Sequence, residues 1–325
     1  MAYRIQFERL GGPEVLTRVD CEPGAPGAGE LRLRQHAVGL NFIDVYVRTG
    51  LYPVPALPSA LGTEGAGVVE AVGPGVAGFK PGDRVAYGSG PLGAYSDVRV
   101  MPAAQVVHLP EGISFEQGAA IMLKGLTVWY LLRKTHRAQA GETVLWHAAA
   151  GGVGLLACQW ARALGVRLIG VAGSAAKAEL ARTHGAWAVI DSSRENVVQR
   201  VLDLTEGRKL PVVYDSVGKA TWETSLDCLA PLGLMVSFGN ASGPVSGVNL
   251  GILAQKGSLY VTRPTLGTYV ARRDQLEEGS RELFEQVLSG AIKIEIGQRF
   301  ALADAGKAHA ALESRATTGS TVLVP

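Results

Sequence analysis

Residues 141–165 read GETVLWHAAAGGVGLLACQWARALG, and this stretch decides the fold. It predicts a β-strand, Thr143–Trp146, that runs into a glycine-rich turn and then into a long helix. Ala149, Gly151 and Gly154 have the spacing G-x-G-x-x-G, with alanine in first place. Small residues permit the tight turn, let the backbone approach a pyrophosphate, and let the helix pack against the strand. With the N–H donors of the helix N-terminus, they predict a dinucleotide phosphate site at Gly151; pure helix–sheet packing is the alternative.

The chain beyond this turn alternates between short β-branched runs and helical patterns. Alternating strands and helices indicate right-handed crossovers and a parallel sheet. Six strands of this kind are typical of a doubly wound dinucleotide-binding fold. The predicted strands are 143–146, 166–171, 187–190, 212–214, 234–238 and 258–261, and helices are predicted at 155–164, 175–184 and 195–204.

The two flanking segments have a different pattern. Residues 1–122 contain short apolar runs separated by Gly and Pro turns, which predicts a compact, mostly β domain. Beyond 270 we predict a helix (274–288), a strand (293–296), a helix (302–314) and a last strand (321–324), forming no further βαβ unit. We expect this tail to pack back on the first domain. The predicted domains are 1–122 and 266–325 around an inserted domain at 123–265.

The composition excludes several classes of protein. Of the 325 residues, 47% are hydrophobic and 18% are charged, which is enough for a large core and excludes a disordered chain. The 31 basic and 29 acidic residues leave a net charge of +2, so nucleic acid is not favoured as a partner. Three scattered cysteines and an N-terminus without an apolar segment favour a soluble cytoplasmic protein that does not enter a membrane.

The end of the second predicted strand bears on which nicotinamide cofactor binds. An NAD-selective site places an acidic residue about 20 residues after the turn. Here the chain instead reads Gly173-Ser174-Ala-Ala-Lys177. A serine hydroxyl and a lysine can both bind a 2′-phosphate, which a carboxylate would repel. Ser174 and Lys177 therefore predict NADPH; the alternative is a helix N-cap serine and a solvated lysine.

No metal site is readable in the sequence. The motifs GxSxG and HExxH do not occur, and the six histidines and three cysteines show no metal-ligand spacing. Hydride transfer needs no metal when the acceptor is already electrophilic, as a quinone or an enone is. We therefore predict a cofactor-dependent reductase without a metal.

Several segments resemble those of the zeta-crystallin-type NADPH:quinone oxidoreductases, which belong to the medium-chain dehydrogenase/reductase superfamily. The segments span the chain in order: NFIDVYVRTGLYP (41–53), LGTEGAGV (61–68), KGLTVWYLL (124–132), HAAAGGVG (147–154), VYDSVG (213–218), VSFGNASG (236–243), GSLYVTRP (257–264) and ESRAT (313–317). The resemblance implies a GroES-like catalytic domain built from both chain ends and an inserted Rossmann domain. Zinc-containing relatives carry a Cys in the segment matching Gly39–Asp44 and a His before Glu64. Here that segment has no Cys and Thr63 precedes Glu64.

The resemblance also implies roles for individual residues. The nicotinamide end of the cofactor would be held by Asn41, Phe42, Asp44 and Tyr46, with Tyr130 on the same side. Gly152 and Val153 would meet the pyrophosphate, and Ser174 and Lys177 the 2′-phosphate. The remaining contacts would come from Ser216, Phe238, Arg263 and Arg315. Close relatives often have a tyrosine on the adenine side, where this chain has Ser192, so a stacking ring is absent and Arg194 would compensate in part.

We hypothesise that a quinone accepts the hydride between the two domains. Tyr46 and Tyr52, with Asn41 nearby, would flank the acceptor and donate a hydrogen bond to it; the alternative is that both tyrosines pack the domain edge. Lys124 and Thr127, at the start of the bridging helix, would stabilise negative charge on the acceptor oxygen. An enone or enal reductase and a cofactor-gated RNA-binding protein are the competing functions. The apolar strand at 258–261 predicts a homodimer, because sheet edges are usually paired or covered.

Overall fold

The computed structural model describes residues 1–314 and 317–325. The chain divides into two compact units. Unit 1 comprises residues 1–126, 269–289 and 294–325, and unit 2 comprises residues 127–268 and 290–293. The boundary at 126/127 lies within one helix, α2 (Phe115–Tyr130). The domain limits at 122 and 265 remain predictions.

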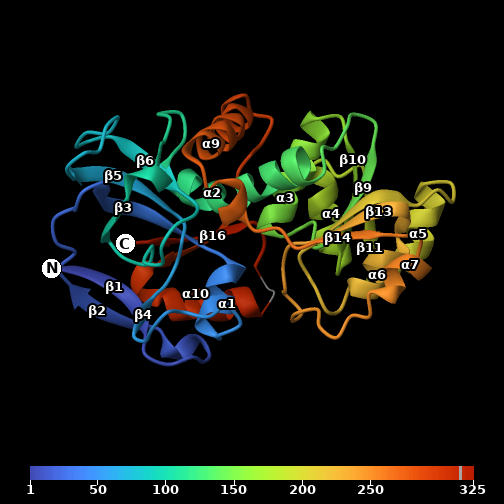
Figure 1. Cartoon of the computed structure of the whole chain (residues 1–325), viewed down its shortest axis with the longest axis horizontal. Coiled ribbons are helices and arrows are strands. Elements are labelled where there is room, and N and C mark those ends of the chain that lie inside the picture. The colour runs from blue at the N-terminus through green and yellow to red at the C-terminus, as the bar shows by residue number, and fades with distance from the viewer. Residues whose placement is uncertain (315–316) are drawn as a thin grey trace. The chain divides into compact units, whose positions relative to one another are not determined.

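Unit 2 is built on a six-stranded parallel sheet (Figure 1). The strand order is β11-β10-β9-β12-β13-β14, with β9 in the centre. This is the order 3-2-1-4-5-6 of a dinucleotide-binding fold, so the predicted doubly wound sheet is confirmed. The strands are β9 (Thr143–Trp146), β10 (Arg167–Ala172), β11 (Ala188–Asp191), β12 (Leu210–Asp215), β13 (Leu229–Ser237) and β14 (Tyr260–Thr262).

Helices connect these strands, as the alternating pattern predicts. Helix α3 (Gly152–Ala163) follows β9 and buries every residue from Gly154 to Ala161, which explains its nearly continuous apolar sequence. The β-branched runs form the sheet core, where Ile169 and Val213 are fully buried. The other helices are α4 (Ala175–Thr183), α5 (Val197–Leu204), α6 (Trp222–Asp227), α7 (Gly251–Gln255) and α8 (Leu266–Tyr269), with a short π-helix at Leu131–Thr135.

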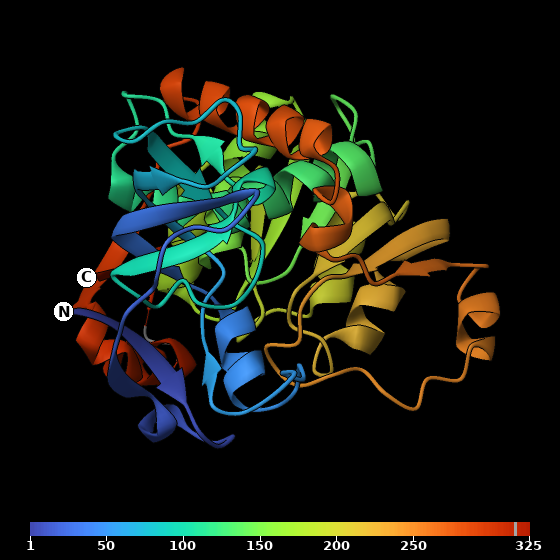
Figure 2. The same ribbon diagram turned by 60° about the vertical axis from the view of Figure 1, so that its left-hand side comes forward.

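Unit 1 is mostly β, as predicted, and both chain ends contribute to it (Figure 2). A three-stranded sheet has the order β2 (Thr17–Cys21), β1 (Ala2–Phe7), β4 (Ser59–Ala60). A seven-stranded sheet has the order β15-β16-β3-β5-β6-β8, with β7 also paired to β3. Its strands are β3 (Glu30–Leu40), β5 (Gly65–Val72), β6 (Arg84–Tyr87), β7 (Val98–Pro102), β8 (Val107–His108), β15 (Ile296–Ala301) and β16 (Ser320–Val324).

The helices of unit 1 lie between and after these strands. Helix α1 (Phe42–Arg48) follows β3, and α9 (Arg273–Leu288) precedes β15. Helix α10 (Ala305–Glu313) joins β15 to β16. Single 3₁₀ turns occur at Pro13–Val15, Ala103–Gln105 and Leu302–Asp304.

The structure corrects two expectations about the C-terminal tail. The predicted strand at 293–296 is wrong, because the backbone of Lys293 is bound by the side chain of Gln159, which donates at 3.0 Å and accepts at 2.7 Å. The strand begins only at Ile296. The expectation of no further βαβ unit is also wrong: β15 and β16 pair in parallel with α10 between them, and β16 then pairs antiparallel with β3.

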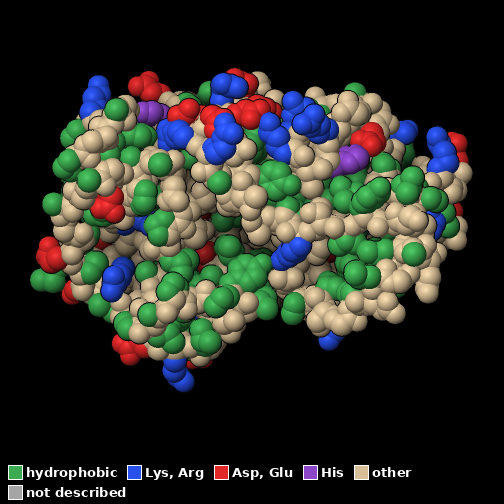
Figure 3. Space-filling view, in the orientation of Figure 1, with side chains coloured by type: hydrophobic (Ala, Val, Ile, Leu, Met, Phe, Trp, Pro, Cys, Tyr) green, Lys and Arg blue, Asp and Glu red, His purple; other side chains and the backbone are tan. Residues whose placement is uncertain are grey.

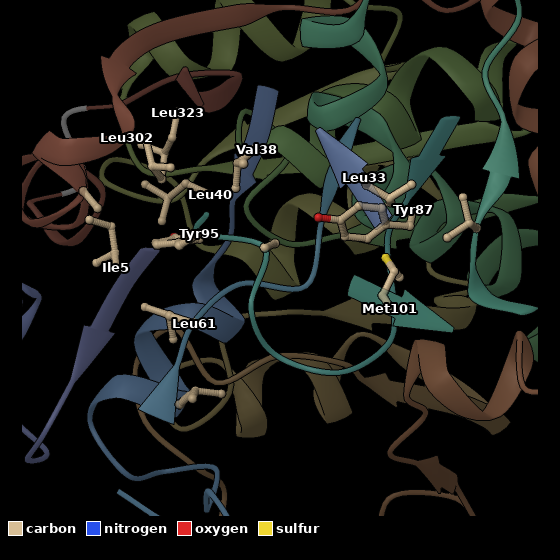
Figure 4. Close-up of a cluster of buried hydrophobic side chains, with 14 of the residues drawn as sticks. Ile5, Leu33, Val38, Leu40, Leu61, Tyr87, Tyr95, Met101, Leu302 and Leu323 are labelled. Atoms are coloured by element: carbon tan, nitrogen blue, oxygen red, sulfur yellow. The ribbon is translucent and has the colours of Figure 1, made fainter. Parts of the chain in front are cut away.

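The core of unit 1 fills the space between its strands (Figure 4). Leu31, Phe7 and Leu61 are completely buried, as are two tyrosines, Tyr87 and Tyr95. A buried phenol needs a hydrogen-bond partner, and both of these phenols have one.

The three cysteines are free thiols. Cys158 in α3 and Cys228 after α6 are fully buried, and burial raises the pKa of each thiol to about 12. Burial also raises the pKa of Cys21, which is half-buried. Nowhere in residues 1–314 or 317–325 does a helix combine the length and hydropathy that a membrane span requires.

Candidate active site

The predicted cofactor residues of unit 2 follow the carboxyl ends of the sheet strands. Because all six strands are parallel, their carboxyl ends lie at one edge of the sheet, where this fold binds its ligands. Gly151, Gly152 and Val153 follow β9, Gly173, Ser174 and Lys177 follow β10, and Ser192, Ser216, Phe238 and Arg263 follow β11, β12, β13 and β14 directly or nearly so. The structure thus brings ten predicted residues to one edge.

The turn after β9 has the shape that a phosphate site requires. Ala148 adopts a left-handed conformation with φ of 53°, so the sharp bend lies one residue before Ala149, the first position of the motif. Gly151 is the N-cap of α3. A Cβ on Gly154 would lie 2.4 Å from the carbonyl oxygen of Ala148, so only glycine allows the helix to approach the turn this closely. The N–H groups of the first turn of α3 have no acceptors within the helix and are available to an anion.

The turn after β10 has no acidic side chain. Ser174 is the N-cap of α4, and its hydroxyl accepts the backbone N–H of Lys177 at 3.4 Å. The alternative of an N-cap serine therefore holds, but the hydroxyl hydrogen can still be donated to a phosphate oxygen. A Cβ on Gly173 would meet nothing within 4 Å, so the backbone is open there. Ser192 donates its hydroxyl to the carbonyl of Ala172 at 3.1 Å and so joins the ends of β11 and β10.

A buried carboxylate shapes the turn after β12. Asp215 accepts the N–H groups of Val217 and Gly218 at 2.7 and 3.0 Å, and the hydroxyls of Thr221 and Ser225 at 2.6 and 2.7 Å. These bonds fix the backbone around Ser216, which is itself half-buried.

The neighbouring strand ends are tied in a similar way. The N–H of Phe238 donates to the carbonyl of Asp215 at 2.8 Å, and the Phe238 ring lies 5.4 Å from that of Trp146. Arg263 donates to the carbonyl of Ser237 at 2.7 Å. Tyr130 is buried in unit 2, with 2% of its surface exposed.

The remaining predicted residues of unit 1 gather at helix α1. Asn41 is the N-cap of this helix, and its backbone N–H donates to the carboxylate of Asp44 at 2.9 Å. The Tyr46 ring is 6.3 Å from that of Phe42 and 5.3 Å from that of Tyr52, which it meets edge to face. Tyr46 is 9% exposed, and Tyr52 packs against the core of unit 1.

Lys124 is paired with a buried carboxylate. Its ammonium lies 3.3 Å from Oε2 of Glu64, and both side chains are almost completely buried. The Asn41 amide donates to the same oxygen at 2.7 Å, and the N–H of Leu123 donates to Oε1 at 2.7 Å. Helix α2 begins at Phe115, so Lys124 lies well inside the helix. The expectation that Lys124 and Thr127 stand at the start of this helix is therefore wrong.

The predicted site residues are thus divided between the two units. Unit 1 holds Asn41, Phe42, Asp44, Tyr46, Tyr52 and Lys124, and unit 2 holds Thr127, Tyr130 and the ten residues at the sheet edge. Thr127 is buried, with 7% of its surface exposed. Arg315 lies outside the described residues.

Sequence reasoning missed a chain of hydrogen bonds that runs from Arg48 through His309 and Tyr95 to Asp44. Tyr95 and His309 lie 51 and 265 positions from it in the chain, and only Arg48 is close, one helical turn away. No local pattern marks such distant contacts. Within the described parts of the chain, no group of three or more His, Cys, Asp or Glu side chains is arranged to hold a metal ion.

Comparisons with known proteins agree with this architecture. Residues 27–111 match the family model described as alcohol dehydrogenase GroES-like domain, and residues 152–285 match that of zinc-binding dehydrogenase. A quinone oxidoreductase of Pseudomonas aeruginosa is 66% identical over the full length of both chains.

Solved structures of similar proteins cover nearly the same length. The chain matches a quinone oxidoreductase of Pseudomonas syringae with a TM-score of 0.98 at 62% identity, covering 100% of both chains. It matches the Escherichia coli quinone oxidoreductase complexed with NADPH with a TM-score of 0.98 at 57% identity, covering 99% of this chain and 100% of that one. With identities this high over the whole length, the chain belongs to the quinone oxidoreductase family of the medium-chain dehydrogenases/reductases.

Proposed function

We propose that the protein is an NADPH:quinone oxidoreductase that transfers a hydride from NADPH to a quinone. The observation that carries the proposal is the shared sheet edge of unit 2, where the glycine turn, Ser174, Lys177, Phe238 and Arg263 all lie. Family membership at 66% identity supports the same activity. The quinone is already electrophilic, so we propose that turnover needs no bound metal.

The residues of the sheet edge fit NADPH. The first turn of α3 offers N–H donors to the pyrophosphate, and the close approach at Gly154 keeps this turn compact. Ser174 and Lys177 hold the 2′-phosphate by a hydrogen bond and a charge, in a turn without a carboxylate. Phe238 and Arg263 border the remaining cofactor. When bound, NADPH supplies the hydride from C4 of its nicotinamide ring.

The side chains at α1 would orient the acceptor. Tyr46 and Tyr52 present two phenols at an edge-to-face angle of 65°, which lets one ring pack on a flat quinone while a hydroxyl donates to its oxygen. Asn41 and Asp44 hold the N-terminus of this helix. Lys124 provides positive charge near Asn41, shared with Glu64, and so stabilises charge on the acceptor oxygen.

Substitution of the two phenols tests this role. Tyr46→Phe and Tyr52→Phe keep the rings and remove one neutral hydrogen bond each, which predicts a fall in kcat/KM for the quinone of roughly two- to tenfold. In Tyr52→Phe, which changes no predicted cofactor residue, the Kd for NADPH should stay unchanged. Unaltered quinone turnover in both variants would leave the tyrosines with a packing role only.

The decisive experiment measures NADPH oxidation with a panel of quinones and 2-alkenals, with NADH as the control cofactor. Rapid oxidation of NADPH by quinones, slower oxidation of NADH, and retention of activity in a chelator are expected. Reduction of alkenals without quinone turnover would identify an enone or enal reductase instead. Salt-sensitive binding of single-stranded RNA without NADPH oxidation would identify the RNA-binding alternative.

We also propose a homodimer joined along β14. Among the described residues β14 pairs only with β13, and Tyr260 and Val261 are 61% and 40% exposed. Leu250, 74% exposed, belongs to an apolar hollow beside this strand, where hydrophobic side chains gather over α6 and β14 in Figure 3. Pairing β14 with its copy would cover this edge and this surface. A monomer in sedimentation at micromolar concentration would contradict the proposal.

We propose the cytoplasm as its location, because three unpaired thiols suit a reducing compartment.

A further inference from the structure

Both ends of helix α1 are held by buried charged side chains. Asp44 and Arg48 are four residues apart, so they lie on one face of the helix, about 40° apart around its axis. Each is 0% exposed. Tyr46 lies midway between them in the sequence, roughly 200° around the axis from Asp44, and therefore points from the opposite face.

Two side chains from distant parts of unit 1 bridge this pair. His309 of α10 lies 3.0 Å from Arg48 through Nδ1 and 3.0 Å from the Tyr95 hydroxyl through Nε2. The Tyr95 hydroxyl in turn lies 3.1 Å from Oδ2 of Asp44. Tyr95 and His309 are both completely buried, and Tyr95 lies in the hydrophobic core near Leu40 and Leu61 (Figure 4).

This chain of hydrogen bonds has only one possible direction. A guanidinium only donates, so Arg48 donates to Nδ1 of His309. The neutral imidazole then carries its hydrogen on Nε2 and donates to the Tyr95 oxygen, which leaves the phenolic hydrogen for Asp44. Burial and the charge of Arg48 lower the pKa of His309 to about 3, which agrees with a neutral ring. Burial raises the pKa of Tyr95 well above its usual value, so it keeps its hydrogen.

An ion pair with Glu313 holds Arg48, the first residue of this hydrogen-bond chain, in place. Arg48 donates to both oxygens of Glu313 at 2.7 and 2.9 Å and to the carbonyl of Gly11 at 3.0 Å. Glu313 is one-third exposed, so the guanidinium is neutralised without its own contact with solvent. The hydrogen-bond chain therefore starts at the fixed positive charge of Arg48, and each group donates to the next one until the Asp44 carboxylate accepts the last hydrogen bond.

Asp44 needs these donors because of its surroundings. Its Oδ2 accepts from Asn41 and Tyr95, while Oδ1 is buried and has no partner among the described residues. The pKa of Asp44 is raised to about 7, mainly by burial and to a smaller extent by the nearby Glu64 carboxylate, while the hydrogen bonds from Asn41 and Tyr95 and the charge of Lys124 lower it. The ionised form is thus held against full desolvation mainly by its hydrogen bonds.

We propose that Tyr95, His309 and Arg48 are positioning residues, whose one-directional hydrogen-bond chain stabilises the Asp44 carboxylate in the capping box of helix α1 and so fixes Tyr46 toward the acceptor. The ionised carboxylate binds the Asn41 N–H more strongly than the protonated form. Tyr46 also binds the loop that follows, because its carbonyl accepts the N–H of Tyr52 at 3.0 Å. Protonation of Asp44 weakens the cap, and the phenols at α1 lose their fixed position.

Infrared titration of the ligand-free protein tests whether the hydrogen-bond chain stabilises the ionised form of Asp44. The carbonyl stretch of protonated Asp44, identified by its absence in Asp44→Asn, should disappear near pH 7 in the wild type. Tyr95→Phe removes the terminal donor and should move this midpoint upward by roughly one to two pH units. Tyr87→Phe is the matched control, because it also removes a buried phenol, one that binds Gln35 instead. Its midpoint should equal that of the wild type.

Enzyme kinetics test whether the ionised Asp44 also supports quinone reduction through Tyr46, a part of the inference that rests on the proposed function. The pH profile of kcat/KM for the quinone should fall on the acid side of the same midpoint, and Tyr95→Phe should shift that fall upward with it. A wild-type protein without quinone turnover would refute the proposed function but leave the infrared test intact. An unshifted midpoint in Tyr95→Phe would overturn the inference. His309→Asn, whose side chain is too short to bridge Arg48 and Tyr95, replaces Tyr95→Phe if that variant does not fold.

Discussion

Gly154→Ala isolates the closest approach in the phosphate turn. The added Cβ would lie 2.4 Å from the carbonyl oxygen of Ala148 and 2.6 Å from two backbone atoms of Ala149. Ordinary contact begins at 3.4 Å, so the start of helix α3 has to move by about 1 Å (3.4 − 2.4). Backbone atoms cannot rotate out of the way as a side chain can, so the turn itself has to deform.

The free energy of this change follows from two opposing effects. Overpacking of a well-packed interior costs up to about 3 kcal/mol, and alanine gains about 1 kcal/mol over glycine within a helix. The unfolding free energy should therefore fall by about 2 kcal/mol. A shift of the N–H donors by about 1 Å should also weaken NADPH binding at least tenfold, equivalent to about 1.4 kcal/mol.

Urea unfolding and calorimetric titration with NADPH measure the two effects. Gly267→Ala is the matched control, because it makes the same substitution within a helix, α8, where the Cβ meets nothing within 4 Å. It should be neutral or stabilise by up to about 1 kcal/mol. If Gly154→Ala proved as stable as Gly267→Ala and bound NADPH as the wild type does, the close approach at this turn would not be what forms the site.

Three further predictions concern other positions. Ala148→Gly should stabilise the protein by up to about 1 kcal/mol in thermal unfolding, because a left-handed alanine costs about 1–2 kcal/mol and glycine adds entropy only to the unfolded chain. Lys124→Met should destabilise by about 3 kcal/mol, since it leaves the Glu64 carboxylate buried without its cation; the double variant with Glu64→Gln should recover most of this loss, and failure to recover would show that packing dominates. His309→Gln tests the pH dependence of stability. Between about pH 3 and 6.5 the His309 ring binds fewer protons in the folded wild type than in the unfolded chain, so its contribution to stability falls as the pH drops through this window. Between pH 7 and 5 the wild type should lose roughly 2 kcal/mol more than His309→Gln, and equal losses would mean that the ring is not buried in its neutral form.

The sequence predicts the architecture of unit 2 well because its signals are local. A strand, a glycine turn and a helix stand in a row at Thr143–Ala163, and each later strand shows its own β-branched run. Once the strands are parallel, the fold rule places all their carboxyl ends at one edge of the sheet, so Ser174 and Arg263 lie on the same edge without any direct signal between them. The left-handed residue at Ala148 is harder to predict, because alanine rarely adopts that conformation.

The parts that the sequence does not predict depend on distant contacts. The strand beginning at Ile296 has alternating burial. The neighbouring Lys293–Glu295 looks equally suited to a strand in the sequence, but the backbone groups of Lys293 are bound by the distant side chain of Gln159. The hydrogen-bond chain that reaches Asp44 runs through Tyr95 of a loop and His309 of the last helix. A histidine and a tyrosine at such separations show no spacing that could reveal a shared hydrogen-bond chain.

The buried thiols have a consequence for a protein that handles quinones. Quinones alkylate cysteines by conjugate addition, and the attacking species is the thiolate. At neutral pH a thiol with a pKa of about 12 is ionised in only about one molecule in 10⁵, and Cys158 and Cys228 are also shielded by the surrounding core. The fold therefore protects both sulfurs from arylation by the very compounds that its relatives reduce, and the half-buried Cys21 is the position where such damage would begin.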